Sequence, residues 1–393
     1  MKILSIETSC DESGISIVEY RSGKEPVFTI TADELHSQID MHREYGGVYP
    51  DLAKREHARV LPIILLKALE KAGLMTNKKS LIDEDMQSLV REILVKEPDL
   101  AEDIIDLAQN ISKPKIDNIA VTAGPGLPPA LWVGVNFAKA LSILWNIPIT
   151  PVNHMEGHIL ASLLENKELD SSNKSYNLKE PKYPCLALLI SGGHTELARF
   201  TELNHYEIIG ETHDDAVGEA FDKVARMLGL PYPGGPEISR LADYARKAQI
   251  VVRGDFRLPR PMLHSGDLNF SFSGLKTAVA TILKKQDNID EDIRLEIALE
   301  FENAVTDVLV KKSERAIYEH NAKSLIVGGG VSANTHIKSQ LSLLCKEENV
   351  DMYYPGKGLS TDNSIMIAVA SHNKKPKALT EIRANGNWSI AEL

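Results

Sequence analysis

The fold is decided by two segments of similar pattern, IDNIAVTAGPGL at residues 116–127 and AKSLIVGGGVSAN at residues 322–334. Each segment is an apolar, β-branched strand that runs into a loop of small residues, and a helical pattern follows it. Strands that alternate with helices in this way are typical of α/β proteins. The two segments therefore predict the same strand, loop and helix in each half of the chain.

Outward from these segments, the same order of elements is predicted on both sides of a polar stretch at 165–182. The predicted elements are strands at 3–6, 15–19 and 27–31 with helices at 51–72 and 131–144, and then strands at 185–190, 194–200 and 206–209 with a helix at about 216–228. We therefore predict a duplicated α/β fold, with one β-β-β-α-β-α-β-α unit in residues 1–170 and another in residues 180–393. The alternative is an α/β protein whose halves merely share the alternation of strands and helices.

Two segments depart from this repeat. Residues 75–116 are acidic and amphipathic, with apolar residues at helical spacing, and predict one or two inserted helices whose role the sequence leaves open. Residues 245–290 mix Arg, Pro and Gly, and predict a long loop that ends in a helix starting at Leu275.

Composition limits what the chain does. Its 393 residues carry 44 Lys and Arg against 55 Asp and Glu, a formal net charge of −11. Because phosphate contacts dominate affinity for nucleic acids, any such binding needs a local positive patch or a partner that supplies one. The three cysteines, Cys10, Cys185 and Cys345, form no CxxC pair, so neither a disulfide framework nor a thiolate zinc site is indicated. No apolar run has the length of a signal or of a membrane span, so we expect a cytoplasmic protein without a membrane partner.

The pentad HMEGH at 154–158 carries two histidines at helical spacing. With Asn153 as N-cap, His154 and His158 project from one face of the first helical turn, where they can hold one metal ion. Solvated or capping histidines give the same spacing, so the pentad alone leaves both interpretations open. The residue after His154 is Met155, so the HExxH pattern of metalloproteases, with its helical Glu base, is absent.

The internal repeat indicates where a third ligand lies. In the second half, the position that corresponds to the pentad follows a strand at 350–354 and precedes an apolar helix at 365–370, and the chain has Asp362 there. Two histidines and a carboxylate suit Zn²⁺ or Fe²⁺ and leave coordination positions open for a substrate oxygen. The alternative is that Asp362 only caps its helix.

Loops of small residues follow apolar strands at three places, 124–127, 191–195 and 328–334. Glycines let backbone N–H groups approach a phosphate, and a following helix N-terminus adds partial positive charge. None of the loops is a Walker loop or a GxGxxG followed by a ribose-binding acid. Each loop alone is compatible with a tight turn, but three at equivalent strand ends predict a nucleotide in a central cleft between the two halves.

The loop between the first two predicted strands is acidic, because Glu7, Asp11 and Glu12 lie in or beside it. Three carboxylates repel phosphate, so a metal ion or the role of a base would have to justify them. The alternative is a solvated hairpin turn.

Nine motifs together resemble one known family. In chain order they are ETSCDES, HSQIDMHREYGGVYPDLAKREH, TAGPGL, NHMEGHILA, LLISGGHTEL, GEAFDKVARMLGLPYPGGP, FSFSGLKTAV, GGGVSAN and STDNSIMIA. Their combination and order are similar to the TsaD family, the tRNA adenosine threonylcarbamoyltransferases, along nearly the whole chain. The resemblance implies an actin-like and Hsp70-like (ASKHA) two-domain fold. It also implies transfer of the threonylcarbamoyl group from threonylcarbamoyl-AMP to N6 of the adenosine just 3′ of the anticodon, in tRNAs that read codons beginning with A.

The resemblance also implies roles for individual residues. It places a metal ion at His154, His158 and Asp362, which spacing and repeat also indicate, and an acidic catalytic pair at Asp11 and Glu12. The residues that it places against the nucleotide or acyl-adenylate are Leu189, Ile190, Ser191, Gly192, Gly193, His194, Asp222, Gly235 and Asn334. Asp11 is our candidate for the base that takes the amine proton, and the alternative is that it only orients the substrate. One departure is Pro128-Pro129-Ala130, where the family usually continues with Gly-Ser.

Cofactors and partners follow from the same resemblance. It implies one divalent ion, Fe²⁺ or Zn²⁺, with ATP or ADP as further candidates for the cleft, and tRNA with a TsaB-like paralogue and a TsaE-like ATPase as partners. A self-sufficient homodimer is the alternative. Two rival functions are an ATP-dependent kinase of small metabolites on the same fold, which needs no metal triad, and a nucleotide-gated scaffold of a tRNA-modifying complex.

Overall fold

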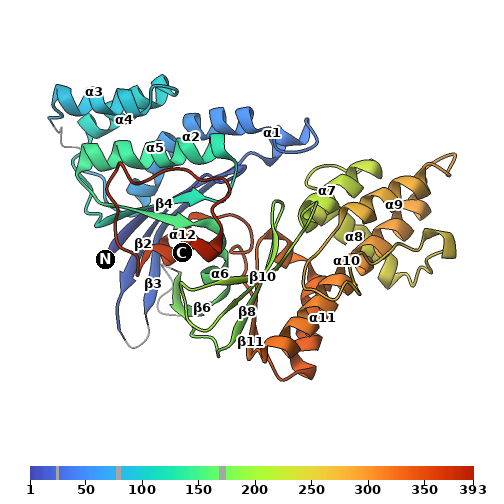
Figure 1. Cartoon of the computed structure of the whole chain (residues 1–393). Coiled ribbons are helices and arrows are strands. Elements are labelled where there is room, and N and C mark those ends of the chain that lie inside the picture. Colours follow the sequence, from blue (N-terminus) through green and yellow to red (C-terminus); the bar gives the residue numbers. More distant parts are fainter. Residues whose placement is uncertain (24–25, 77–80, 168–173) are drawn as a thin grey trace. The chain divides into compact units, whose positions relative to one another are not determined.

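The computed structural model describes residues 1–23, 26–76, 81–167 and 174–393. The chain forms two compact units (Figure 1). Unit 1 comprises Met1–Asp40, Val48–Lys179 and Asp362–Ser389, and unit 2 comprises Met41–Gly47, Glu180–Thr361 and Ile390–Leu393. The predicted halves met at 170–180, of which 170–173 lie outside the described residues. Unit 1 also takes residues 362–389, because helix α12 (Ser364–Ser371) packs against strands β1 and β2 of that unit.

Unit 1 is built on a seven-stranded sheet with the order β5-β4-β1-β2-β3-β7-β6. The strands are β1 (Lys2–Glu7), β2 (Glu12–Arg21), β3 (Val27–Ser37), β4 (Asn118–Gly124), β5 (Ile149–Asn153), β6 (Leu164–Lys167) and β7 (Ser175–Leu178). Strands β1, β2 and β3 are antiparallel, whereas β1, β4 and β5 are parallel. Because side chains alternate along a strand, Leu4 and Ile6 enter the apolar core while Ser5 and Glu7 face the other side of the sheet.

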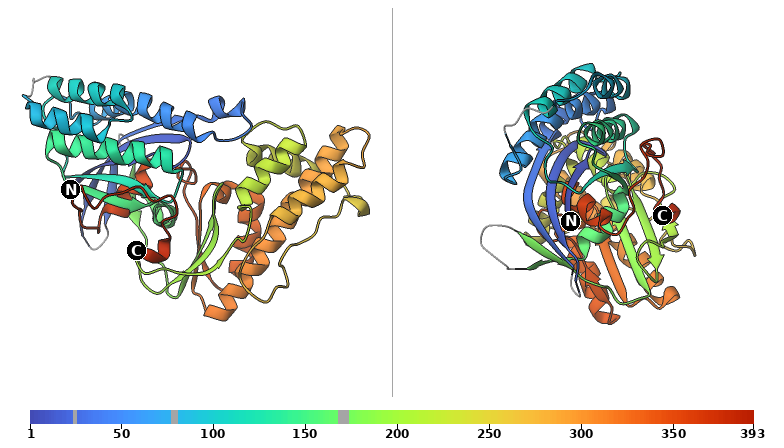
Figure 2. Two further views of the ribbon diagram at one scale, coloured as in Figure 1. Left: turned by 45° about the horizontal axis from the view of Figure 1, so that its top comes forward. Right: turned by 90° about the vertical axis from the view of Figure 1, so that its left-hand side faces the viewer.

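Helices cover both faces of this sheet. They are α2 (Pro50–Lys71), α3 (Glu84–Ile93), α4 (Pro98–Asn110), α5 (Pro128–Trp145), α6 (His154–Ser162) and α12. Helices α2 and α5 pack on one face, and α6 and α12 pack on the other (Figures 1 and 2). The insertion predicted at 75–116 forms two helices, α3 and α4, with residues 77–80 outside the description. Helix α5 begins earlier than predicted, since Pro128 is well suited to a first helical position.

Unit 2 repeats the topology of unit 1. Its five-stranded sheet has the order β10-β9-β8-β11-β12. The strands are β8 (Cys185–Ile190), β9 (Thr195–Phe200), β10 (Glu207–Glu211), β11 (Ser324–Gly328) and β12 (Asp351–Tyr353). Strands β8, β9 and β10 are antiparallel, and β8, β11 and β12 are parallel. The strands β3-β2-β1-β4-β5 of unit 1 have the same order and the same directions as β10-β9-β8-β11-β12 of unit 2. The predicted duplicated, actin-like α/β fold is therefore confirmed.

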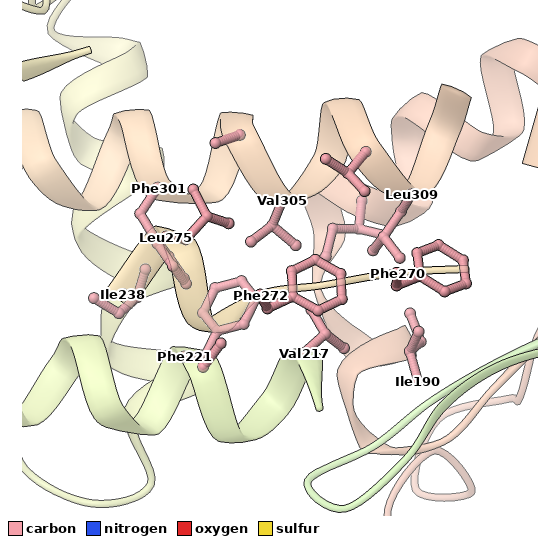
Figure 3. Packing of buried hydrophobic residues seen from close by; sticks show 14 of the residues in the cluster. Ile190, Val217, Phe221, Ile238, Phe270, Phe272, Leu275, Phe301, Val305 and Leu309 are labelled. Carbon is pink, nitrogen blue, oxygen red and sulfur yellow. The ribbon is translucent and has the colours of Figure 1, made fainter. Parts of the chain in front are cut away.

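The core of unit 2 lies between its sheet and its long helices. The helical elements are α7 (Val217–Met227), α8 (Gly234–Lys247), η1 (Gly254–Phe256), α9 (Ser273–Leu283), α10 (Glu291–His320), η2 (Gly330–Ala333), α11 (Thr335–Glu347) and η3 (Ile390–Glu392), and α1 (Ile39–Arg43) spans the unit boundary. Phe221 of α7 and Phe301 of α10 meet edge to face with ring centroids 5.0 Å apart. Phe270 and Phe272, from the predicted loop before α9, fill the space between these helices (Figure 3). None of the described helices is long and apolar enough to cross a membrane.

Candidate functional site

Helix α6 carries both histidines of the pentad. Asn153 caps it as predicted, accepting hydrogen bonds from Met155 N at 2.9 Å and Glu156 N at 3.3 Å. His154 and His158 share one face, with ring centroids 4.7 Å apart. His154 is 5% exposed and His158 is fully buried. The alternative of solvated histidines is therefore excluded.

Asp362 completes a cluster with these histidines inside unit 1. Its Oδ1 lies 3.2 Å from His158 Nε2 and 3.3 Å from His154 Nε2, and the two nitrogens are 3.2 Å apart. Ligand atoms at about 2.0–2.1 Å from a tetrahedral zinc ion lie about 3.3 Å from one another. The three atoms have that spacing, and two imidazoles with one carboxylate are donors that both Zn²⁺ and Fe²⁺ accept. The residues present thus fit a metal ion.

The alternative role of Asp362 as a helix cap is wrong, because the next residue has that role. Asn363 is the N-cap of α12 and accepts a hydrogen bond from Met366 N at 3.0 Å. Asp362 precedes the cap and turns its carboxylate to the histidines instead.

Glu7 holds His154 from the other side of the imidazole. The carboxylate of Glu7 is fully buried at the end of β1, and its Oε2 lies 3.2 Å from His154 Nδ1 and accepts a hydrogen bond from Thr122 Oγ1 at 2.5 Å. A carboxylate that accepts the Nδ1 proton fixes the imidazole tautomer and leaves Nε2 available as a ligand. His158 Nδ1, in contrast, is buried with no hydrogen-bond partner among the described residues.

The charges of the cluster favour a cation or protons at its centre. Burial lowers the pKa of His154, but the carboxylates of Asp362 and Glu7 outweigh burial and hold that pKa well above its usual value. Burial keeps the pKa of His158 below its usual value. Burial raises the pKa of Asp362, but the two histidines outweigh it and hold that pKa well below its usual range. Two carboxylates therefore face imidazole nitrogens in a buried site, which stabilises positive charge between them.

The acidic loop lies beside this cluster. Asp11 is only 7% exposed, so the alternative of a solvated turn is excluded. Burial, with the charges of Asp11 and Asp362, raises the pKa of Glu12 to about 10, and Glu12 is hydrogen-bonded to Asp11. This shift disfavours the ionised form of Glu12 and therefore a role for Glu12 as the base. Of the predicted acidic pair, Asp11 is the better candidate for that role.

His57 of α2 clamps the acidic loop from behind. Its Nε2 lies 2.9 Å from Cys10 O, and its Nδ1 lies 2.7 Å from Ser13 Oγ. Because a carbonyl only accepts, Nε2 carries the proton and Nδ1 accepts the Ser13 hydroxyl. Burial lowers the pKa of His57, which favours this neutral form. Gln38 N adds a hydrogen bond to Asp11 O at 2.9 Å. His57 and Gln38 thus hold the loop backbone on both sides and fix the position of Asp11.

In unit 2, the turn at 191–194 joins β8 to β9. Ser191 N donates to His194 O at 2.9 Å, and Ser191 Oγ accepts from His194 N at 3.0 Å. A side chain at Gly192 or Gly193 would meet nothing within 4 Å, and neither residue has a positive φ. Nothing in the described protein therefore requires glycine at these two positions, whereas a ligand that approaches the backbone closely does.

Other residues expected at the nucleotide are linked to this turn within unit 2. Gly218 N of α7 donates to Ser191 O at 3.1 Å. One turn further along α7, the Oδ1 atom of Asp222 accepts a hydrogen bond from Gly234 N at 2.7 Å, at the start of α8. A side chain at the next residue, Gly235, would also meet nothing within 4 Å. The chain thus brings the turn, Asp222 and Gly235 into one neighbourhood.

Leu189 and Ile190 are fully buried at the end of β8. Gly329, which has a φ of +89°, follows β11 beside them, and a Cβ there would lie 2.5 Å from Ile190 O. Glycine is therefore required in the third loop by packing and backbone conformation.

Asn334 ends that loop and caps α11. Its Oδ1 accepts hydrogen bonds from His336 N and Ile337 N, each at 3.0 Å. Its amide nitrogen donates to the buried Glu302 Oε1 at 2.8 Å. The structure thus gives Asn334 a structural task, and its predicted contact with a nucleotide stays a prediction.

The loop at 124–127, in unit 1, is also explained by packing. A Cβ at Gly124 would lie 1.9 Å from Asn385 O, and one at Gly126 would lie 2.7 Å from Ser9 O. Gly126 N donates to Gly386 O at 3.1 Å. Since the chain itself covers this loop, its glycines give no sign of a ligand.

Sequence reasoning missed how Glu7 and His57 act. The signal for Glu7 was the alternation of β1, which places it on the face of Ser5, away from the core residues Leu4 and Ile6. No local pattern could have identified His57, because its partners Cys10 and Ser13 lie on another strand and loop.

Comparison with known proteins identifies the family. A family model named TsaD, described as tRNA N6-adenosine threonylcarbamoyltransferase, matches residues 29–82 and 97–369. The residues between these ranges, which contain α3, are not matched by the family model.

Known proteins match the chain over nearly its whole length. A tRNA N6-adenosine threonylcarbamoyltransferase of Methylobacillus flagellatus is 42% identical over 399 residues, which cover 100% of this chain and 99% of that protein. The protein of the same name from Aromatoleum aromaticum is 39% identical, in an alignment that covers 100% of this chain and 98% of that protein. Among solved structures, the ROK hexokinase of Thermus thermophilus shares 11% sequence identity at a TM-score of 0.40, with 94% of this chain and 97% of that chain covered. From the family model and the relatives, the chain belongs to the TsaD family, the tRNA N6-adenosine threonylcarbamoyltransferases.

Proposed function

We propose that this protein transfers the threonylcarbamoyl group of threonylcarbamoyl-AMP to N6 of the adenosine just 3′ of the anticodon, in tRNAs that read codons beginning with A. Membership of the family supports the reaction class. The observation that carries the chemistry is the cluster of His154, His158 and Asp362, whose ligand atoms lie 3.2 to 3.3 Å apart.

These three residues would hold one divalent ion, Zn²⁺ or Fe²⁺. Such an ion, when bound, supplies Lewis-acid polarisation of the carbamoyl oxygen. Glu7 supports the set, since it accepts the Nδ1 proton of His154 and so keeps the Nε2 lone pair directed at the cluster.

Asp11 is the proposed base. The exocyclic amine of adenine is a poor nucleophile, so its proton has to leave as the new N–C bond forms. In the same step the bond between the carbamoyl carbon and the phosphate oxygen breaks, and AMP leaves. Glu12 is hydrogen-bonded to its neighbour Asp11 and orients it, while His57 and Gln38 hold the loop backbone in place.

The proposed phosphate contact is the turn at Ser191, Gly192 and Gly193. Backbone N–H groups bind phosphate closely where no side chain intervenes. The space beside Gly192, Gly193 and Gly235, which no described atom fills within 4 Å, supports this proposal. We propose that this turn binds the phosphate of threonylcarbamoyl-AMP, and ATP or ADP is the alternative ligand.

Partners follow from the charge of the chain. A protein with a formal net charge of −11 needs added positive surface to hold a tRNA well. We propose a TsaB-like paralogue and a TsaE-like ATPase as the proteins that assist it, and a self-sufficient homodimer is the alternative.

The test is a transfer assay with purified protein, threonylcarbamoyl-AMP and an unmodified tRNA transcript, with and without the two partner proteins. We expect threonylcarbamoyladenosine in the nuclease digest of the tRNA, detected by mass spectrometry. If the adenylate is never consumed, the chain is a scaffold. If ATP instead phosphorylates a small metabolite, the chain is a kinase, and either result refutes the proposal.

A further inference from the structure

Near its C-terminus, the chain forms a strap, residues 374–388, that is tied at both ends to the helix of the metal cluster. At one end, Lys374 Nζ lies 2.8 Å from Oε2 of the fully buried Glu156. At the other end, Asn153 Nδ2 donates to Trp388 O at 3.0 Å. Asn153 caps α6 and Glu156 lies in its first turn, so both anchors hold the strap against the helix of His154.

Between its anchors the strap is fixed to the sheet of unit 1. Lys377 N donates to Ile149 O of the edge strand β5 at 2.9 Å, and Asn385 N donates to Ala123 O of β4 at 2.7 Å. Ile382 is buried in the core of the unit. In Figure 1 this segment is the dark red trace beside β4 and α5. A segment with these contacts presents its remaining side chains in a defined arrangement.

The strap is basic on an acidic protein. Apart from Lys374, it carries Lys375, Lys377 and Arg383, which are exposed and have no ion pair within the described part of the chain. Its one acid, Glu381, accepts a hydrogen bond from the N–H of residue 378 at 3.0 Å and forms no ion pair with these cations. The strap therefore displays three exposed cations against one carboxylate.

Helix α5 adds to this basic surface. The strap packs against the start of this helix, since a Cβ at Gly386 would lie 2.8 Å from Pro128 Cγ. Burial, with a smaller contribution from the charge of Arg383 in the strap, lowers the pKa of Lys139 on the same helix. Neither cation has an acidic partner among the described residues. Two turns before Lys139 on the same helix face, Trp132 is 39% exposed. An exposed aromatic ring on the same helix face as an unpaired cation suits nucleic acid, since bases stack on the ring and phosphates meet the cation.

We propose that the strap and the adjoining face of α5 bind the phosphate backbone of the tRNA substrate. The surface residues are Lys375, Lys377, Arg383, Lys139 and Trp132. This inference rests on the proposed function for the identity of the RNA. It gives a net acidic protein the local positive patch that RNA binding requires. It also places bound RNA on a segment anchored to α6, the helix that carries His154 and His158.

The test compares two triple variants that change the net charge equally. The strap variant is Lys375→Gln, Lys377→Gln and Arg383→Gln. The control variant is Arg21→Gln, Lys67→Gln and Lys115→Gln, three exposed cations of unit 1 outside the strap that form no ion pair with any described residue. Binding of an unmodified tRNA transcript to the full-length chain is measured by filter retention between 50 and 200 mM salt, and tryptophan fluorescence checks that both variants are folded.

We expect the strap variant to bind tRNA on the order of 10- to 100-fold more weakly near 0.15 M salt, and the slope of log K against log salt to fall by about two to three. The control should stay within about twofold of wild type in affinity. In the transfer assay the strap variant should show a raised KM for tRNA at unchanged kcat and unchanged affinity for the adenylate.

Equal losses in the two triple variants, or an unchanged salt slope in the strap variant, would overturn the proposal. A strap variant that keeps its tRNA affinity but no longer binds the paralogue would also overturn it and would make the strap a protein interface. If wild type binds tRNA with this salt slope yet transfers no threonylcarbamoyl group, the proposed function fails while the RNA surface stands.

Discussion

Replacement of His57 tests the clamp behind the acidic loop. His57→Leu removes the partner of Cys10 O at 2.9 Å and the acceptor of the Ser13 hydroxyl at 2.7 Å. His57 is fully buried, so both groups lose their hydrogen bonds without gaining water. Each orphaned buried group costs about 1–3 kcal/mol, so we expect unit 1 to lose roughly 2–6 kcal/mol of its free energy of unfolding.

The assay is urea unfolding followed by tryptophan fluorescence. The three tryptophans, Trp132, Trp145 and Trp388, all belong to unit 1, so their emission reports this unit alone. The matched variant Ser13→Ala removes one of the two hydrogen bonds, and the double variant Ser13→Ala/His57→Leu removes the hydroxyl that the single variant orphans. The double variant should therefore be more stable than the sum of the single losses predicts.

The pH dependence of wild-type stability tests the clamp independently. Because burial lowers the pKa of His57, the unfolded chain binds a proton at this residue at a pH where the folded chain does not. Wild-type stability should therefore fall as the pH drops below about 6.5, the ordinary value for histidine. His57→Leu lacks this titrating group, so its free energy of unfolding does not fall with pH for this reason. The difference in free energy of unfolding between wild type and His57→Leu should therefore narrow toward low pH.

The same variant should transfer the threonylcarbamoyl group at least about tenfold more slowly and still hold its metal ion, because the loop moves while His154, His158 and Asp362 stay. If His57→Leu loses less than about 1 kcal/mol of its free energy of unfolding, and if that free energy depends on pH as in wild type, His57 does not clamp the acidic loop.

Two further predictions concern the ligands. Gly193→Val should abolish binding of threonylcarbamoyl-AMP in a calorimetric titration, because the new side chain would occupy the space of the phosphate. The thermal melt should stay close to wild type, because a side chain there meets no described atom within 4 Å. An unchanged affinity would remove the phosphate role from this turn. The isolated chain, with its net charge of −11, should bind tRNA weakly at physiological salt and more tightly once the paralogue is added. Tight binding by the lone chain in a filter assay would count against a need for partners.

Much of the fold could be predicted because its signals are local. Apolar strands that end in small-residue loops identified the repeat, and the matching strand orders of the two sheets follow from it. The His154 and His158 pair followed from helical spacing, and the repeat located Asp362. The return of residues 362–389 to unit 1 could not be predicted, because it depends on packing between segments more than two hundred residues apart in sequence.

The details of the site depend on such distant contacts. Sequence could not separate Asp362 from Asn363 as the helix cap, since both residue types cap helices well; the orientation of the backbone decides it. The three glycine loops looked alike in sequence, yet packing explains Gly124 and Gly329 and leaves Gly193 without such a reason. The raised pKa of Glu12 arises from burial beside Asp11 and Asp362, which only the folded chain brings about.

The central claim is that His154, His158 and Asp362 hold one metal ion for the transfer reaction. The most direct measurement is metal content by elemental analysis together with threonylcarbamoyl transfer, for wild type, His154→Ala, His158→Ala and Asp362→Asn. We expect all three variants to lose the ion and activity together and to a similar extent, because the ligands act as one unit, and double variants should add little. Full metal content with full transfer in Asp362→Asn would contradict the claim, because the lost negative charge should weaken the site.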